Sequence, residues 1–234
     1  MTTSIVNISE NIKCVRGDIE AAAAGTGRGA GDILLVAAAK TNSAERVREA
    51  IAAGVDAVGE NRVQEMLEKH ARGAYIGAPL HFIGHLQSNK VGKVVGTCDL
   101  IESVGSEALL RAIGKKAAAM GIVQKVLIEI NIGREPQKSG ILPEQAEEIL
   151  GVASQIVGIN VNGFMAIPPN FQENKKNRNF FALMNNLFLD MSGKKYDNVS
   201  MQFLSMGMSD SYADAIAAGA NMVRIGSAIF GDRD

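Results

Sequence analysis

Short apolar runs alternate with longer amphipathic stretches along most of the chain. The runs that we expect to form strands lie at 33–39, 55–60, 80–83, 100–103, 126–130, 159–165, 201–204 and 221–224. Continuous apolar runs between turn residues are typical of buried parallel strands, and each run here is followed by a stretch with helical spacing. Eight strand–helix units in about 200 residues predict an α/β fold, a single (β/α)8 TIM barrel. Periodicity alone leaves an open doubly wound sheet as the alternative.

Residues 1–30 precede the first expected strand. Apolar positions recur there at steps of three and four, at Ile5, Ile8, Ile12, Val15 and Ile19. This spacing predicts an extra N-terminal helix packed across the main domain. The glycine-rich stretch 25–31 comes before a strand and not after one, so we interpret it as a linker and not as a dinucleotide-binding loop. The predicted organisation is one domain over 1–234, with the helix and linker at 1–30 and the barrel at 31–234.

Composition and charge argue against several kinds of partner. The net charge is −1 over 234 residues, which disfavours binding to nucleic acid or to an anionic membrane surface. The two cysteines and three histidines have no metal-ligand spacing, so we expect no metal site and a reducing compartment. The sequence has no visible leader and no apolar segment of membrane-spanning length, so we expect a cytoplasmic protein.

Lys40 is the first candidate for chemistry, because it follows directly on the apolar run 33–39. A lysine at the end of a buried strand is held by a rigid element, and its stem lies against apolar walls. Desolvation disfavours the charged ammonium and leaves an amine that can attack a carbonyl. The alternative is a lysine that extends to solvent.

Two later turns offer a place for an anion. Ser205 and Gly207 follow the seventh strand, and Gly226 and Ser227 follow the eighth. Glycine lets an anion approach the backbone N–H groups, hydroxyls add donors, and a phosphate site is often found at this position in such barrels. Ordinary turns with helix caps are the alternative. Because strands one and eight are neighbours in a closed barrel, Lys40 would face these turns, a pairing suited to a molecule with an aldehyde and a phosphate.

Arg224 interrupts the apolar eighth strand, where an unpaired charge is costly. It could bind a phosphate or a ring nitrogen. The alternative is a salt bridge to Glu60 or Glu129 inside the barrel. The helix that follows the seventh strand is expected to be capped near Ser209.

Six ordered segments carry a family resemblance that runs from about Ile33 to Gly231. They lie at 39–41, 59–65, 81–90, 164–169, 204–210 and 223–231. In these segments the chain resembles the pyridoxal phosphate homeostasis proteins of the YggS/PROSC type, which are similar to the barrel domain of alanine racemase. The family often has a proline shortly after the lysine and a threonine at the position of Ser227; this chain has neither.

The resemblance implies a cofactor and a set of residues that bind it. The cofactor is pyridoxal 5'-phosphate (PLP), held as a Schiff base on Lys40. Ser205, Gly226 and Ser227 match phosphate-binding positions. Asn61 and Met165 match positions that line the cofactor, and Arg224 matches an arginine near the pyridine nitrogen.

The same comparison predicts a carrier with no assigned catalytic residue. Racemisation needs acid–base groups on both faces of the cofactor, and in alanine racemase a tyrosine from a second domain serves the second face. The tyrosines of this chain, Tyr75, Tyr196 and Tyr212, are expected at the wrong end of the barrel or packed away from the site. An arginine at the ring nitrogen also weakens the ring as an electron sink.

Our hypothesis is therefore a monomeric protein that buffers PLP and delivers it to PLP-dependent apoenzymes, with little or no turnover. A PLP-dependent amino-acid racemase and a Schiff-base phosphosugar aldolase are the alternatives. His81 and His85 flank the end of the third strand, where a packed or solvated role is expected for each. Lys138, in the loop 134–140, is a candidate for capturing cofactor before delivery.

Overall fold

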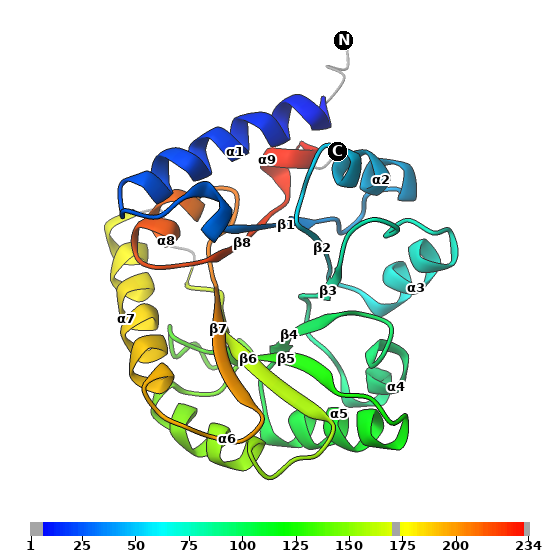
Figure 1. The fold of residues 1–234 in the computed structure, drawn as a ribbon, viewed down its shortest axis with the longest axis vertical. Coiled ribbons are helices and arrows are strands. Elements are labelled where there is room, and N and C mark those ends of the chain that lie inside the picture. Colours follow the sequence, from blue (N-terminus) through cyan, green and yellow to red (C-terminus); the bar gives the residue numbers. More distant parts are fainter. Residues whose placement is uncertain (1–6, 170–173, 232–234) are drawn as a thin grey trace.

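The eight strands form one closed parallel barrel in sequence order (Figure 1). The computed structural model describes residues 7–169 and 174–231, so Ile5 of the predicted N-terminal helix lies outside the described residues. The strands are β1 Leu34–Ala38, β2 Ala57–Glu60, β3 Leu80–Phe82, β4 Leu100–Val104, β5 Gln124–Ile130, β6 Ile159–Ala166, β7 Val199–Ser205 and β8 Met222–Ile225. β1 pairs with β8 from Leu34↔Met222 to Ala37↔Ile225, which closes the barrel and confirms the TIM-barrel prediction over the open sheet.

Helices surround the strands. The described helices are α1 Ile8–Ala24, α2 Ala44–Ala52, α3 Val63–Ala71, α4 Val91–Val94, α5 Glu107–Ala119, α6 Ala146–Ala153, α7 Asn174–Ser192, α8 Tyr212–Ala217 and α9 Ser227–Phe230. Three 3-10 turns join them, η1 Ala30–Asp32, η2 Ser88–Lys90 and η3 Pro143–Gln145. The Ser43 hydroxyl accepts from the Arg46 N–H, as expected for the cap of α2. No helix in the described ranges is long and apolar enough to cross a membrane.

α1 lies across one side of the barrel against α2, α8 and α9 (Figure 1). Its buried positions recur along one face, at Ile8, Ile12, Val15, Ile19 and Ala23. Its polar contacts with the barrel include the Tyr212 hydroxyl, which donates to Asp18 at 2.6 Å, the Asn11 amide, which donates to the Ile229 carbonyl at 2.9 Å, and an ion pair of Arg16 with Asp56 at 2.8 Å. The extra N-terminal helix is confirmed, and stretch 25–31 leads through η1 into β1 as a linker.

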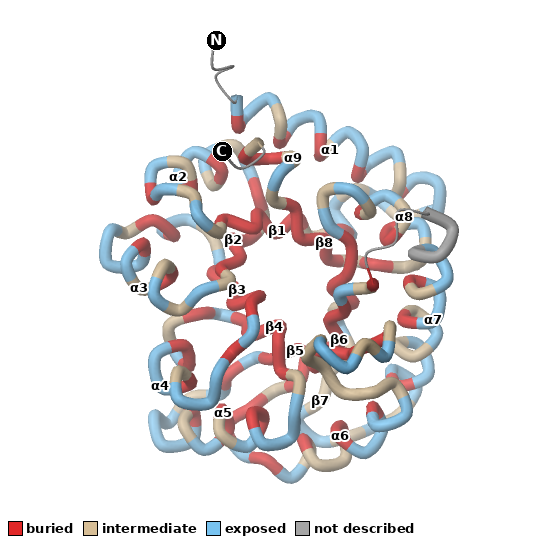
Figure 2. Tube along the Cα trace, turned by 180° about the vertical axis from the view of Figure 1, so that it is seen from behind, coloured by how far each residue is buried: buried red, intermediate tan, exposed pale blue. Residues whose placement is uncertain are grey.

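The core has an outer and an inner part. The large outer cluster fills the space between the strands and the helices, and Figure 2 shows buried backbone around the ring of strands with exposed surfaces on the helices. The small inner cluster fills the barrel itself with Val36, Ala57, Leu100, Leu127, Met165 and Met222. Successive side chains of a strand alternate between faces. The buried residues two positions after Leu100, Leu127 and Met222 are therefore expected to point inward as well, and all three are charged: Glu102, Glu129 and Arg224.

Candidate functional site at the barrel mouth

The reactive-lysine candidate lies beyond the end of β1, at the end of the barrel where all strands finish (the barrel mouth). The strand register pairs Ala37 with Ile225, so the exits of β1 and β8 are adjacent. A Cβ atom built on Gly226 would lie 3.5 Å from the Ala38 carbonyl, which shows how closely the two exits approach. Lys40 is half-buried there. The structure thus brings Lys40, Gly226 and Ser227 to one junction of the barrel mouth.

A buried ion pair supports this exit from the helix side. Lys69 on α3 bonds Glu60 at 2.7 Å and donates to the Ala39 carbonyl at 2.8 Å. Tyr75 also donates to Glu60, at 2.9 Å. Burial raises the pKa of Glu60, and the hydrogen bonds from Lys69 and Tyr75 oppose that rise only in part. The contacts of Lys69 could not be predicted from the sequence, because a lysine in a helical pattern is expected to be one more exposed polar residue.

Arg224 lies inside the barrel in a polar network. One guanidinium nitrogen donates to the Ser205 hydroxyl at 2.5 Å and lies 3.7 Å from a Glu102 oxygen, and the other donates to the Ala166 carbonyl at 3.0 Å. The alternative prediction of a salt bridge to Glu60 or Glu129 was wrong in its partner. Glu60 points to Lys69 in the helix layer, and the carboxylate within ion-pair range of Arg224 belongs to β4.

Glu102 is the centre of this network. It accepts from Ser205 at 2.6 Å, and its other oxygen lies 2.7 Å from Nδ1 of the buried His81. Burial favours the protonated acid, but the hydrogen bond from His81 and the charges of His81 and Arg224 outweigh it and lower the pKa of Glu102. The side chain of Ser205, predicted to contact phosphate, is therefore occupied inside the barrel between a carboxylate and a guanidinium.

Glu129, also on the inner face, behaves differently. Burial raises the pKa of Glu129, although the charges of Arg224 and His85 oppose this. One of its oxygens is buried without a hydrogen-bond partner among the described residues. The pKa values of these two inward carboxylates are thus shifted in opposite directions. Burial raises that of Glu129 more than the charges of Arg224 and His85 and a hydrogen bond from Ser139 lower it, whereas the contacts of Glu102 outweigh its burial.

The turns after β7 and β8 fold onto each other. The N–H groups of Gly226 and Ala228 both donate to the Ser209 hydroxyl, at 3.2 and 3.3 Å. The helix start expected near Ser209 lies slightly later: α8 begins at Tyr212 with Ser211 at its N-cap position, and Ser209 lies against the β8 exit. Gly207 has a φ of 96°, and a Cβ there would meet the Ala215 side chain at 2.7 Å. Only glycine fits this fold-back.

Asn61 and Met165 are the two residues that were predicted to line the cofactor. Asn61 follows β2, and its side-chain oxygen is buried without a partner among the described residues. A Cβ on Gly84 would lie 2.1 Å from the Asn61 carbonyl, so the loop after β3 packs directly on the Asn61 backbone. Met165 belongs to the inner cluster and pairs with Ser205 of β7.

Lys138 and the three tyrosines, the remaining candidates, bond to other protein groups. Lys138 bonds Glu135 at 2.5 Å and the Pro168 carbonyl at 3.3 Å. The hydroxyls of Tyr75 and Tyr212 bond Glu60 and Asp18 in the helix layers, and that of Tyr196 bonds Glu147 on α6 at 3.4 Å. No group of three or more potential metal ligands occurs among the residues described.

Comparison with known proteins identifies the family. Residues 26–234 match the family described as alanine racemase, N-terminal domain. The chain is 38% identical to the pyridoxal phosphate homeostasis protein of Aquifex aeolicus, over 97% of this chain and 99% of that protein. It superposes on PipY of Synechococcus elongatus PCC7942, solved with PLP bound, with a TM-score of 0.83 and 29% identity, covering 96% of this chain and 100% of PipY.

More distant structures share the fold alone. Alanine racemase of Clostridium difficile 630 superposes with a TM-score of 0.71 and 19% identity, and the match covers 97% of this chain but 60% of the racemase. The closed barrel, the junction of its first and last strands and the similarity to the relatives named above all indicate the same family. The chain belongs to the pyridoxal phosphate homeostasis protein family, within the group that shares the alanine racemase N-terminal barrel.

Proposed function

We propose that this protein binds PLP covalently through Lys40, buffers it and hands it to other proteins, with little or no turnover of its own. The observation that carries the proposal is the junction of β1 with β8, which places the half-buried Lys40 beside the Gly226–Ser227 turn. A relative named for PLP homeostasis is 38% identical over nearly the whole chain, and PipY was solved with PLP bound. Bound PLP supplies an aldehyde that joins an amine with loss of water, and a ring that can withdraw electrons.

The residues at the junction fit such a ligand. The N–H groups of Gly226 and Ala228 converge on one point, now taken by the Ser209 hydroxyl, and a phosphate oxygen can accept the same two donors. Ser227 adds a hydroxyl at the start of α9. The unpartnered oxygen of Asn61 is an acceptor for a ring hydroxyl.

Arg224 would lie near the pyridine nitrogen, with Ser205 and Met165 beside it. The buried guanidinium stays charged because Glu102 compensates it, although burial itself lowers the pKa of Arg224. A cation at this place disfavours a protonated ring nitrogen and so weakens the ring as an electron sink. Racemisation also needs a second proton-transferring group, and the three tyrosine hydroxyls bond Glu60, Asp18 and Glu147 instead. Both features favour a carrier.

Delivery to PLP-dependent apoenzymes in the cytoplasm, by a monomer, completes the proposal. The exposed side chains around the barrel mouth leave the junction open to a partner, while the inner apolar cluster closes the barrel beneath it.

Absorption spectroscopy tests the role of Lys40. The purified protein incubated with PLP should show the visible band of a Schiff base; Lys40→Ala should abolish the band, and Lys138→Ala, at another loop of the mouth, should keep it. A band that survives in Lys40→Ala refutes the assignment. Exchange of amino-acid α-protons with deuterated solvent, measured by NMR, should stay at the level of PLP alone. Rapid exchange would establish a racemase-type activity instead.

A further inference from the structure

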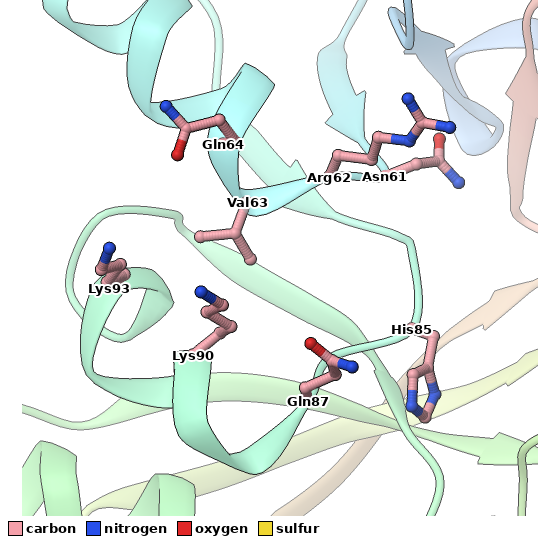
Figure 3. A pocket seen from close by; sticks show the side chains of 8 residues that line it. All are labelled: Asn61, Arg62, Val63, Gln64, His85, Gln87, Lys90 and Lys93. Atoms are coloured by element: carbon pink, nitrogen blue, oxygen red, sulfur yellow. The ribbon is translucent and has the colours of Figure 1, made fainter.

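A second hollow lies at the mouth beside the proposed PLP site. It measures about 270 Å³ and is formed by the start of α3 and by the segment that runs from β3 through η2 into α4 (Figure 3). Its lining comprises Asn61, Arg62, Val63, Gln64, His85, Gln87, Lys90 and Lys93. Both segments follow strand ends, so the hollow opens on the same side of the barrel as Lys40, and it shares Asn61 with the proposed cofactor site.

The lining is rich in hydrogen-bond donors. All of its side chains except Val63 carry an N–H group and none is a carboxylate, although the Gln64 amide donates to Glu68 at 2.7 Å. Figure 3 shows the Lys90 and Lys93 ammonium groups extending from the η2–α4 segment toward the start of α3. This cluster of cations belongs to a chain whose net charge is −1, so it reflects local placement and not a basic composition. A concave, donor-rich surface is complementary to an anion with several oxygens.

The two lysines make no ion pair with any described residue, whereas Lys69, Lys138 and Lys194 each bond a carboxylate. Lys90 is also half-buried, so its charge has lost part of its hydration without gaining an ion-pair partner in the described part of the chain. Arg62 is paired with Glu65 at 3.1 Å, but its side chain is 73% exposed and free to turn. An anion bound in the hollow would balance these charges.

The backbone adds to the positive charge around the hollow. α3 begins at Val63, and the residue before it, Arg62, provides no side-chain cap. The first N–H groups of a nine-residue helix are thus left toward the hollow, where they carry partial positive charge. A helix start alone would not define a site; here it coincides with a hollow of ligand size and with two lysines that make no ion pair with the described residues.

We propose that this hollow binds a small phosphomonoester. A single carboxylate offers two oxygens and would leave several of these donors unused, whereas a phosphate dianion accepts from lysines, amides and backbone N–H groups together. The volume exceeds that of the phosphate group, so the rest of the ester also has room. Two esters share this chemistry, a nucleotide and a second molecule of free PLP, and inorganic phosphate is a probe for the group that they have in common. The site does not depend on the Schiff base at Lys40.

Calorimetric titration of the PLP-loaded protein tests the proposal, because loading fills the Gly226 turn. Inorganic phosphate should bind wild type, and Lys90→Gln/Lys93→Gln should weaken this binding by a factor of about ten or more. The matched control is Lys115→Gln/Lys125→Gln, which removes the same charge from lysines of α5 and β5 outside the hollow and should leave the affinity unchanged. Circular dichroism checks the fold of both variants, and the single variant Lys93→Gln, at an exposed position, should already weaken binding.

Further titrations identify the source and separate this proposal from the previous one. On the PLP-loaded protein, further free PLP should bind at the hollow, while pyridoxal, which lacks the phosphate, should not; adenosine monophosphate tests the nucleotide. Equal phosphate affinity in wild type and in Lys90→Gln/Lys93→Gln would overturn the proposal. So would a result in which polyglutamate binds and none of the phosphate compounds does. A Schiff-base band that survives in Lys40→Ala would overturn only the role of Lys40.

Discussion

Replacing Glu102 with glutamine should both destabilise the barrel and displace Arg224. The Glu102 side chain is fully buried and that of Arg224 is 4% exposed, with the charged groups 3.7 Å apart. Removing one member of a buried ion pair typically costs about 3–5 kcal/mol, because the other charge is left without compensation. Glutamine keeps the shape and can still accept from Ser205, so we expect a loss near the lower end, about 3 kcal/mol. His81, 2.7 Å from Glu102, would lose its anionic partner in the same change.

Urea unfolding followed by circular dichroism measures this loss. A double-mutant cycle with Arg224→Met isolates the pair: the double variant should lose about 1–3 kcal/mol less than the sum of the single variants, because neither charge is then buried alone. The control is Glu147→Gln, which removes an exposed carboxylate paired with Lys194 and should leave the unfolding midpoint in place. Additivity of the two buried changes within about 0.5 kcal/mol would refute the reasoning.

Three other outcomes can be measured at the same contacts. Because the pKa of Glu102 is lower in the folded protein, its ionisation stabilises the fold above the ordinary glutamate pKa of 4.5, and this contribution is lost as pH falls through the folded value; urea midpoints measured from neutral to acid pH should fall less steeply in Glu102→Gln than in wild type. Gly84→Ala should push the β3 loop off the Asn61 carbonyl, with a loss of about 1–3 kcal/mol in urea unfolding and weaker PLP binding by absorbance titration; unchanged values would contradict the steric argument. Lys69→Met should leave Glu60 buried without its cation, at a cost of about 3–5 kcal/mol, and Lys69→Met/Glu60→Gln should recover part of that loss in thermal unfolding.

The strands and helices could be predicted from the sequence, because each depends on short-range patterns. Closure of β1 on β8 was expected from the number of strand–helix units, and the structure decided it over the open sheet. Apolar runs give strands, and Ser43 caps α2 where a serine before a helical pattern is expected to do so. Placement of Lys40 beside Gly226 then follows from closure of the barrel alone, without knowledge of any side-chain contact.

The partners inside the barrel could not be predicted in this way. Arg224 was given Glu60 or Glu129 as its alternative partner, but strand position does not tell which acid faces inward at the right height. Glu60 follows the same apolar pattern as Glu102 and yet points outward to Lys69. The contact of Ser209 with the β8 exit was missed for a similar reason, because it depends on how two loops meet in space.

Part of the missing information was nevertheless present in the strands. A parallel strand reads as continuously apolar because both faces are buried, which hides the alternation between them. In β4, β5 and β8 a charged residue follows two positions after an inner apolar residue, so three strands change from an apolar to a charged layer along the same direction. This layering separates two tasks. The inner apolar layer supports the barrel, and the charged layer above it holds Arg224 beneath the junction where Lys40 meets the last strand. Substitutions in the apolar layer should therefore lower the stability of the barrel. Arg224, in contrast, can be replaced without leaving a buried uncompensated charge only if Glu102 is replaced with it.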